Sequence, residues 1–210
     1  MSVLVVVRRR ARPGSEEALI EAMMRRVADR ARGDRRSRLV WLFQAVDAPG
    51  DLLYAALWPS ASDYWRRHQT SPPTSLDELC TGPPERYFFE RRRTIEVVSQ
   101  RAQAVDCLFV RVGQAEPAAV EQYLLEDALH VAERRPGFVL HAVYRGREEA
   151  SLLFAMHGWE TPEALGGFRA EALPGLVQEL TALGAAVTLF AGRMRAGAAG
   201  LPHGLYTWRS

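Results

Sequence analysis

The pattern of hydrophobic and polar positions predicts the same order of helices and strands twice along the chain. The first half predicts a strand, a helix, two strands, a short helix and a long strand, at 3–7, 15–33, 39–46, 52–58, 63–68 and 86–98. The second half predicts strands at 107–113, 138–144, 151–158 and 185–194, and helices at 117–134, from 161 and at 176–183. Each half therefore follows the β-α-β-β-α-β order of the ferredoxin-like fold.

Capping residues support the predicted helix starts. Ser15 stands before two glutamates, and Ser60 or Ser62 precedes the short helix of the first half. Thr161 is followed by Pro162 and then by an acid, which is typical of a first helical turn. These signals favour helices where the periodicity predicts them.

The predicted strands are apolar at both odd and even positions, so both faces of each sheet should be buried. This holds for the segments 3–7, 39–43, 52–58, 138–143 and 152–156. Helices can cover one face, and the simplest cover for the other face is the sheet of the other copy. We expect one domain at 1–100, a second at 101–195 and a C-terminal tail at 196–210.

Composition and charge narrow the picture further. The chain has 210 residues with 48% hydrophobic residues, and all 27 basic residues are arginine, which excludes Schiff-base chemistry on a lysine. The net charge of +2 is too small a basic excess, for a chain of this length, to indicate nucleic-acid binding. The run Arg8-Arg9-Arg10 could bind phosphates, but we expect a solvated strand end. Cys80 and Cys107 are expected to be free thiols.

Targeting signals are not evident in the sequence. No apolar stretch approaches the length of a membrane span, and the apolar start lacks the features of a signal peptide. We therefore expect a cytoplasmic protein with neither a membrane nor nucleic acid as its partner. Hydrolase elbows, phosphate-binding loops and dinucleotide fingerprints do not occur.

Four local motifs recur at element boundaries, and they are the segments Pro13-Gly14-Ser15-Glu16-Glu17, Trp58-Pro59-Ser60-Ala61-Ser62-Asp63, Arg135-Pro136-Gly137-Phe138 and Trp159-Glu160-Thr161-Pro162-Glu163. Together they resemble the antibiotic biosynthesis monooxygenase domain of the dimeric α/β-barrel superfamily. Members are usually single domains that dimerise, so this chain resembles a fused version. The resemblance implies an α+β fold of two tandem ferredoxin-like (βαββαβ) domains, packed sheet to sheet as an intramolecular dimeric α/β barrel.

The resemblance also implies a pocket between each sheet and its own helices. Family members that oxygenate phenolic or anthrone-like substrates use no metal or flavin, because the substrate anion itself reduces dioxygen. The protein must then bind an aromatic ring, assist its deprotonation and exclude water. The expected partner is a small aromatic molecule, and two fused barrels could form a homodimer.

Six residues are candidates for this chemistry. His68 and His157 are the candidate bases, and Trp58 and Trp159 would position the substrate ring or donate an indole N–H to it. Tyr54 shares the strand parity of Trp58, and His141 lies on the strand beside His157. The alternative for each is an ordinary role in the core or at a helix end.

We therefore predict a cofactor-independent monooxygenase acting on a phenolic or polycyclic aromatic substrate in one copy or both. One alternative is a haem-binding or haem-degrading protein that uses His68. Haem-degrading relatives have an Asn on the first strand where this chain has Val7, which argues against their mechanism. The other alternative is a non-catalytic, small-molecule-binding or stress-related protein.

Overall fold

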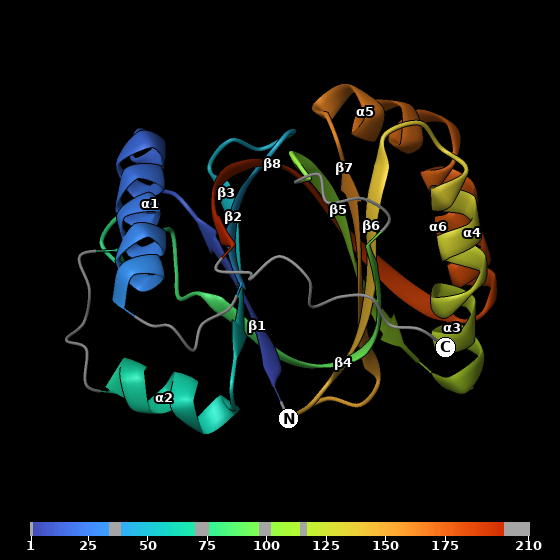
Figure 1. The fold of residues 1–210 in the computed structure, drawn as a ribbon, viewed down its shortest axis with the longest axis horizontal. Coiled ribbons are helices and arrows are strands. Elements are labelled where there is room, and N and C mark those ends of the chain that lie inside the picture. The colour runs from blue at the N-terminus through green and yellow to red at the C-terminus, as the bar shows by residue number, and fades with distance from the viewer. Residues whose placement is uncertain (1, 34–38, 70–75, 97–101, 114–116, 200–210) are drawn as a thin grey trace. The chain divides into compact units, whose positions relative to one another are not determined.

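The computed structural model describes residues 2–33, 39–69, 76–96, 102–113 and 117–199 (Figure 1). The chain forms two compact units, unit 1 (Met1–Phe89 and Met194–Ser210) and unit 2 (Glu90–Arg193). Both strands that cross a unit boundary, β4 (Glu85–Glu96) and β8 (Ala185–Ala199), contribute residues to each unit. The boundaries of these two units therefore differ from the boundaries of the expected domains, 1–100 and 101–195. The packing of one copy's sheet on the other stays a prediction.

Unit 1 has an antiparallel sheet with helices on one face. Its remaining elements are β1 (Val3–Arg10), α1 (Glu16–Gly33), β2 (Leu39–Ala45), β3 (Asp51–Trp58) and α2 (Ala61–Gln69). The strand order is β4-β1-β3-β2, as in a ferredoxin-like sheet. Leu19, Met23 and Val27 of α1 pack in one core with Val3 and Val5 of β1, which confirms the predicted inward face of this helix.

Unit 2 repeats this order. Its elements are β5 (Ala104–Val112), α3 (Pro117–Leu125), α4 (Asp127–Glu133), β6 (Phe138–Gly146), β7 (Leu152–Trp159), α5 (Pro162–Glu171), α6 (Leu173–Ala182) and most of β8. The strand order is β8-β5-β7-β6. Every residue of β7 is buried, so both faces of this strand are covered, as its apolar sequence predicts. The fold is therefore α+β with antiparallel strands.

Two of the predicted capping residues, Ser60 and Thr161, act as expected. The Ser60 hydroxyl accepts from the Asp63 amide at 3.1 Å and donates to the Asp63 carboxylate at 2.6 Å, at the start of α2. The Thr161 hydroxyl accepts from the Ala164 amide at 3.2 Å at the start of α5. These contacts satisfy backbone donors that a helix start leaves without a partner.

Among the element boundaries that differ from the sequence prediction, three change the interpretation. The helix expected at 117–134 is interrupted at Glu126, whose backbone departs from helical geometry (φ −119°, ψ −66°) between α3 and α4. Strand β5 begins at Ala104 and not at 107, which places Asp106 inside the strand. Strand β8 continues to Ala199, so 196–199 are strand where a tail was expected, and 200–210 lie outside the described residues.

The cysteines and the helices of the described part of the chain bear on two further expectations. Cys80 and Cys107 are both buried and free, as predicted. None of the helices in these residues combines the length and the apolar character needed to cross a bilayer.

Candidate functional site

A row of three polar side chains crosses the sheet of unit 2. In the strand register, Asp106 of β5 lies opposite His157 of β7, and His157 lies opposite His141 of β6. Directly opposed residues share one face of a sheet, so the three side chains point to the same side. Asp106 is 1% exposed and both histidines are 0% exposed. Strand pairing therefore gathers a carboxylate and two imidazoles in a dry environment.

The Asp106 carboxylate accepts two hydrogen bonds. Its Oδ1 accepts from the Trp159 indole N–H at 2.7 Å, and its Oδ2 lies 2.8 Å from Nδ1 of His157. Because both carboxylate oxygens act as acceptors, His157 carries its proton on Nδ1 and its lone pair on Nε2. The carboxylate thus orients the imidazole and presents Nε2 as a base, which is the role that an aspartate plays toward histidine in a catalytic triad.

The remaining nitrogens of the two imidazoles have no hydrogen-bond partner within the described ranges. These are Nε2 of His157 and both ring nitrogens of His141. The two ring centroids lie 5.0 Å apart. Burial, and then the nearby His157, lower the pKa of His141 to about 2, although the backbone of Leu124 acts in the opposite direction. His141 is therefore neutral at physiological pH.

The helices of unit 2 lie over this row. Phe168 of α5 packs against Trp159 with ring centroids 4.7 Å apart, and against His157 at 5.6 Å. The backbone of Leu124 in α3 approaches the His141 ring without meeting the geometry of a hydrogen bond. The row therefore lies between the sheet and its own helices, which is where the sequence resemblance places the functional site.

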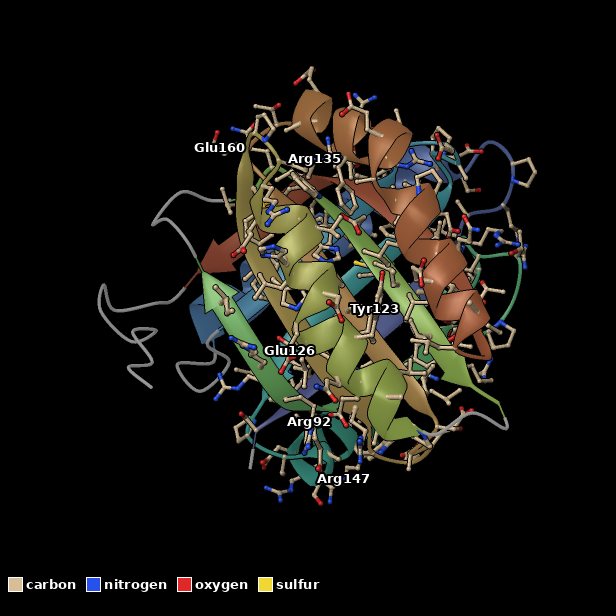
Figure 2. All side chains as sticks on the ribbon, turned by 90° about the vertical axis from the view of Figure 1, so that its right-hand side faces the viewer. Arg92, Tyr123, Glu126, Arg135, Arg147 and Glu160 are labelled. Atoms are coloured by element: carbon tan, nitrogen blue, oxygen red, sulfur yellow. The ribbon has the colours of Figure 1, made fainter. Side chains whose placement is uncertain are left out.

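An ion cluster around one buried carboxylate ties α3 to this sheet. Glu121 of α3 is 5% exposed and pairs with Arg92 of β4 and Arg145 of β6. In Figure 2, Arg92 and Arg147 lie at one end of the α3 and α4 helices, and Arg135 and Glu160 lie at the other end. Because Arg145 and His141 share the parity of β6, the cluster fixes α3 next to the polar row.

Unit 1 has apolar side chains at the matching positions. Val3 lies opposite Trp58 in the register of β1 and β3, as Ala104 lies opposite Trp159 in unit 2. The equivalents of Asp106, His157 and His141 are accordingly Val5, Ala56 and Val40. All three are buried, so the polar row occurs in one copy of the fold.

Unit 1 instead brings four aromatic and imidazole rings together. Trp58 lies 5.3 Å from Tyr64 and 6.0 Å from His68 between ring centroids, and Phe88 lies 5.3 Å from Tyr64. The predicted pair Trp58 and His68 is therefore close in space. Tyr54 is half-buried and packs against the same core.

The ring of His68 is oriented by its own helix. Its Nδ1 donates to the Tyr64 carbonyl at 2.8 Å, and the two rings stack with centroids 4.0 Å apart. Arg86 Nε in turn donates to the Tyr64 hydroxyl at 3.2 Å. A carbonyl can only accept, so the His68 lone pair is on Nε2.

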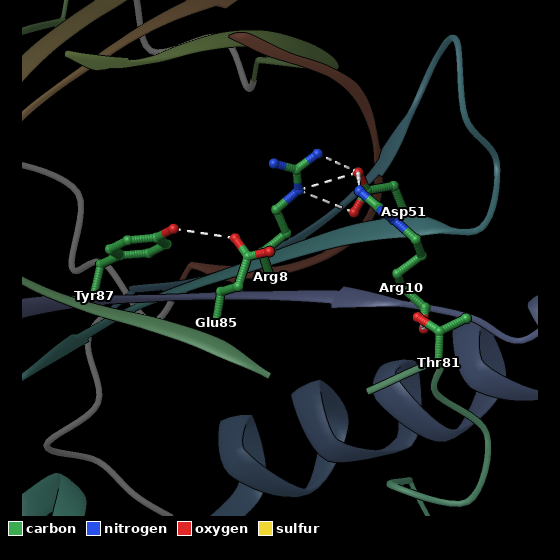
Figure 3. Close-up of polar contacts among 6 residues, drawn as sticks. All are labelled: Arg8, Arg10, Asp51, Thr81, Glu85 and Tyr87. Atoms are coloured by element: carbon green, nitrogen blue, oxygen red, sulfur yellow. Dashed lines mark hydrogen bonds and ion pairs between the residues drawn. The ribbon is translucent and has the colours of Figure 1, made fainter. Parts of the chain in front are cut away.

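The arginine run at the end of β1 forms ion pairs within unit 1 (Figure 3). Arg8 Nε donates to both oxygens of the buried Asp51 carboxylate at 3.0 and 3.1 Å, and Arg10 lies 3.8 Å from it. Arg9 pairs with Asp77 at 2.8 Å. The solvated strand end expected from the sequence is therefore wrong for Arg8 and Arg9, whose side chains are 19% and 7% exposed. Hydrogen bonding to Asp51 also raises the pKa of Arg8.

Sequence reasoning missed Asp106, which holds two of the candidate residues in place. The predicted strand began at Cys107, so Asp106 read as a polar residue outside the strand. A lone acid inside the apolar run 104–110 is the signal that could have identified it. The structure also gives the Trp159 N–H to Asp106, where the sequence suggested a substrate oxygen. Among the described residues, no group of three or more His, Cys, Asp or Glu could hold a metal ion.

Three solved structures illustrate what the fold is similar to. An anthrone oxidase-like protein matches at 17% identity and a TM-score of 0.72, covering 97% of this chain and 96% of its own. An uncharacterized ferredoxin-fold protein related to antibiotic biosynthesis monooxygenases, from Listeria monocytogenes 4b F2365, matches at 12% identity and a TM-score of 0.52, covering 92% and 95%. A haem-degrading enzyme from Listeria monocytogenes matches at 11% identity and a TM-score of 0.50, covering 92% and 99%.

These likenesses extend over both units and establish the fold. They confirm the fold resemblance that the sequence motifs suggested. No protein-family model matches the chain, and no curated protein sequence matches it.

Proposed function

We propose that unit 2 catalyses the cofactor-independent oxygenation of a phenolic or polycyclic aromatic substrate, with His157 as the base. One observation carries this proposal: Asp106 holds Nδ1 of a buried imidazole, and the opposite nitrogen has no partner within the described ranges. An imidazole that a carboxylate orients in this way can act as a general base.

The reaction begins when His157 Nε2 takes a proton from the substrate. Asp106 stabilises the resulting imidazolium by its charge and by the existing hydrogen bond. The substrate anion passes one electron to dioxygen, and the two radicals combine to form a carbon–oxygen bond. Loss of water from the peroxide converts a ring CH₂ to a carbonyl, so one dioxygen yields one ketone and one water. The proton held on His157 is returned in forming that water.

The surroundings of His157 favour a reactive anion. Burial removes competing water and strengthens electrostatic interactions inside the site. Phe168 packs against the imidazole and Trp159 packs against Phe168, so a flat substrate could stack in this group of rings. Because His157 is fully buried, a substrate reaches Nε2 only when a neighbouring side chain moves. Phe168 of α5 packs against His157, so it is one side chain whose movement would give access.

Oxygen consumption with anthrone as the probe tests the proposal. We expect one dioxygen taken up per anthraquinone formed, with a rate about 10² to 10⁴ lower for His157→Ala, the usual contribution of a general base. His130→Ala is the matched control, because His130 is an exposed histidine of α4 in the same unit, and it should retain the wild-type rate. Unchanged uptake by a folded His157→Ala protein would overturn the proposal.

A second candidate is haem binding through His68 of unit 1. His68 donates its Nδ1 proton to a backbone carbonyl, which is how a metal-ligating histidine is often held, and Nε2 would be the ligand atom. Trp58 and Tyr54 would then line the haem. If unit 1 is an oxygenase instead, the same two residues would position an aromatic substrate. Titration with haemin separates the readings: a saturable Soret shift that His68→Ala abolishes supports haem binding. A protein that binds an arene but neither takes up oxygen nor binds haem is a non-catalytic binder.

A further inference from the structure

Three imidazole nitrogens without partners lie together in the buried row of unit 2. A buried polar atom without a hydrogen bond is costly, and most proteins contain few of them. Here Nε2 of His157 and both ring nitrogens of His141 lack partners in the part of the chain that the structure describes. Such a group of unpartnered nitrogens indicates a binding site for a molecule that supplies the missing hydrogen bonds.

Packing of the fold does not require these imidazoles. Val40 and Ala56 occupy the same register positions in unit 1 and are equally buried. The ferredoxin-like sheet is therefore built with apolar side chains at both positions elsewhere in this chain. The cost of two buried imidazoles in unit 2 calls for a ligand as its explanation.

The donors and acceptors of the two rings define the chemistry of the ligand. His157 Nε2 is an acceptor, because Nδ1 holds the proton that is donated to Asp106. His141 is neutral, so it offers one N–H donor and one acceptor whichever tautomer it adopts. The pair can therefore bind one hydroxyl group, which donates to His157, and one further oxygen, which accepts from His141.

We propose that His141 and His157 together bind two neighbouring oxygen atoms of one ligand, a hydroxyarene that carries a second hydroxyl or carbonyl oxygen next to the first. This inference rests on the proposed function for the direction of proton transfer, since His157 takes the proton of the hydroxyl. His141 then donates to the oxygen that becomes negatively charged. Phe168 and Trp159 are positioned to pack against the aromatic ring.

Anaerobic calorimetry on the full chain tests this pairing without any turnover. The probes are 1,8-dihydroxynaphthalene and 8-methyl-1-naphthol, which have similar size and differ in the second oxygen. Wild-type protein should bind the dihydroxy compound about tenfold more tightly, because the methyl compound leaves a buried donor without a partner. His141→Val should reduce this preference to near one, and it introduces the residue type that unit 1 carries there.

Two controls keep the experiment decisive. His130→Ala, on the surface of α4, should keep the tenfold preference. Nitrogen-15 spectra of labelled histidine should show that the dihydroxy compound moves the His141 ring signals, a readout that does not depend on the stability of a variant. Unmoved His141 signals, equal affinity of wild type for both probes, or a preference that survives in His141→Val would each overturn the inference.

The outcome is separable from that of the proposed function. A dihydroxy preference that depends on His141, in a protein that takes up no oxygen, supports the paired binding site and rejects the oxygenase. Oxygen uptake that depends on His157, without any preference between the probes, supports the oxygenase and rejects the paired site.

Discussion

The two units use the same sheet positions for different purposes. In unit 1 the row formed by Val5, Ala56 and Val40 is apolar and belongs to the core, whereas unit 2 has Asp106, His157 and His141 in that row. Both units retain a buried tryptophan at the end of the third strand. The same sheet is therefore compatible with an apolar or a polar row, so the polar residues of unit 2 are explained by chemistry and not by architecture.

The strongest test of this comparison converts the row of unit 2 into that of unit 1. The triple variant Asp106→Val, His141→Val, His157→Ala should fold, because unit 1 tolerates these side chains at the same positions. Its oxygen uptake should fall at least about 100-fold, since the base is lost. Circular dichroism and an oxygen electrode measure the two results, and an active triple variant would show that unit 2 is not the site of oxidation.

Replacing Asp106 alone should destabilise the protein more than the loss of one side chain would suggest. Asp106→Val leaves the Trp159 N–H and the His157 N–H buried without an acceptor. Each such group costs about 1–3 kcal/mol, so the free energy of unfolding should fall by roughly 2–6 kcal/mol. Urea denaturation measures it. A variant as stable as wild type would mean that the Asp106 contacts do not hold the row together.

Acid should distinguish the units through His141. Its pKa is about 2 in the folded protein and near 6.5 when unfolded, so between these values the unfolded chain binds the extra proton. The free energy of unfolding is therefore highest above pH 6.5, and it decreases as the pH falls below that value. From pH 6.5 to 4.5 wild type should lose about 2–3 kcal/mol more than His141→Val. Parallel losses in urea titrations at the two pH values would contradict this.

The smallest expected effect concerns the second helix of each unit. Helix α5 contains Gly166 and Gly167, where α2 has Trp65 and Arg66 at the matching positions. A methyl group at either glycine would meet nothing within 4 Å. Gly166→Ala and Gly167→Ala should each stabilise unit 2 by roughly 0.5–1 kcal/mol and raise the midpoint of thermal unfolding. A lowered midpoint would show that these glycines serve the packing of α5.

Much of the fold could be predicted from local pattern. Apolar strands at both parities, and capping residues such as Ser60 and Thr161, predict elements that the structure confirms. Local pattern does not fix which strand residues lie opposite one another. The sequence placed His141 and His157 on adjacent strands, but not in one register pair, and it left Asp106 outside the strand.

The sequence also did not allow a prediction of which polar side chains pair with one another. Arg8 and Arg9 read as a charged run at a strand end, because their acids, Asp51 and Asp77, are more than 40 residues away. The Trp159 indole was one candidate to donate to a ligand, with core packing as the alternative, and it donates to Asp106. Long-range pairing of polar groups depends on register and burial, which are properties of the folded chain.

The pairing of Asp51 with Arg8 and Arg10 has a consequence for chemical modification of the protein. A buried carboxylate that relied on lysine could lose its counterion through acetylation of the amine or at strongly alkaline pH. This chain contains no lysine, and a guanidinium keeps its charge even in alkali. Asp51 therefore keeps its cationic partners under amine-directed labelling, carbamylation and high pH, so reagents of that kind can be used on the protein without loosening the end of β1.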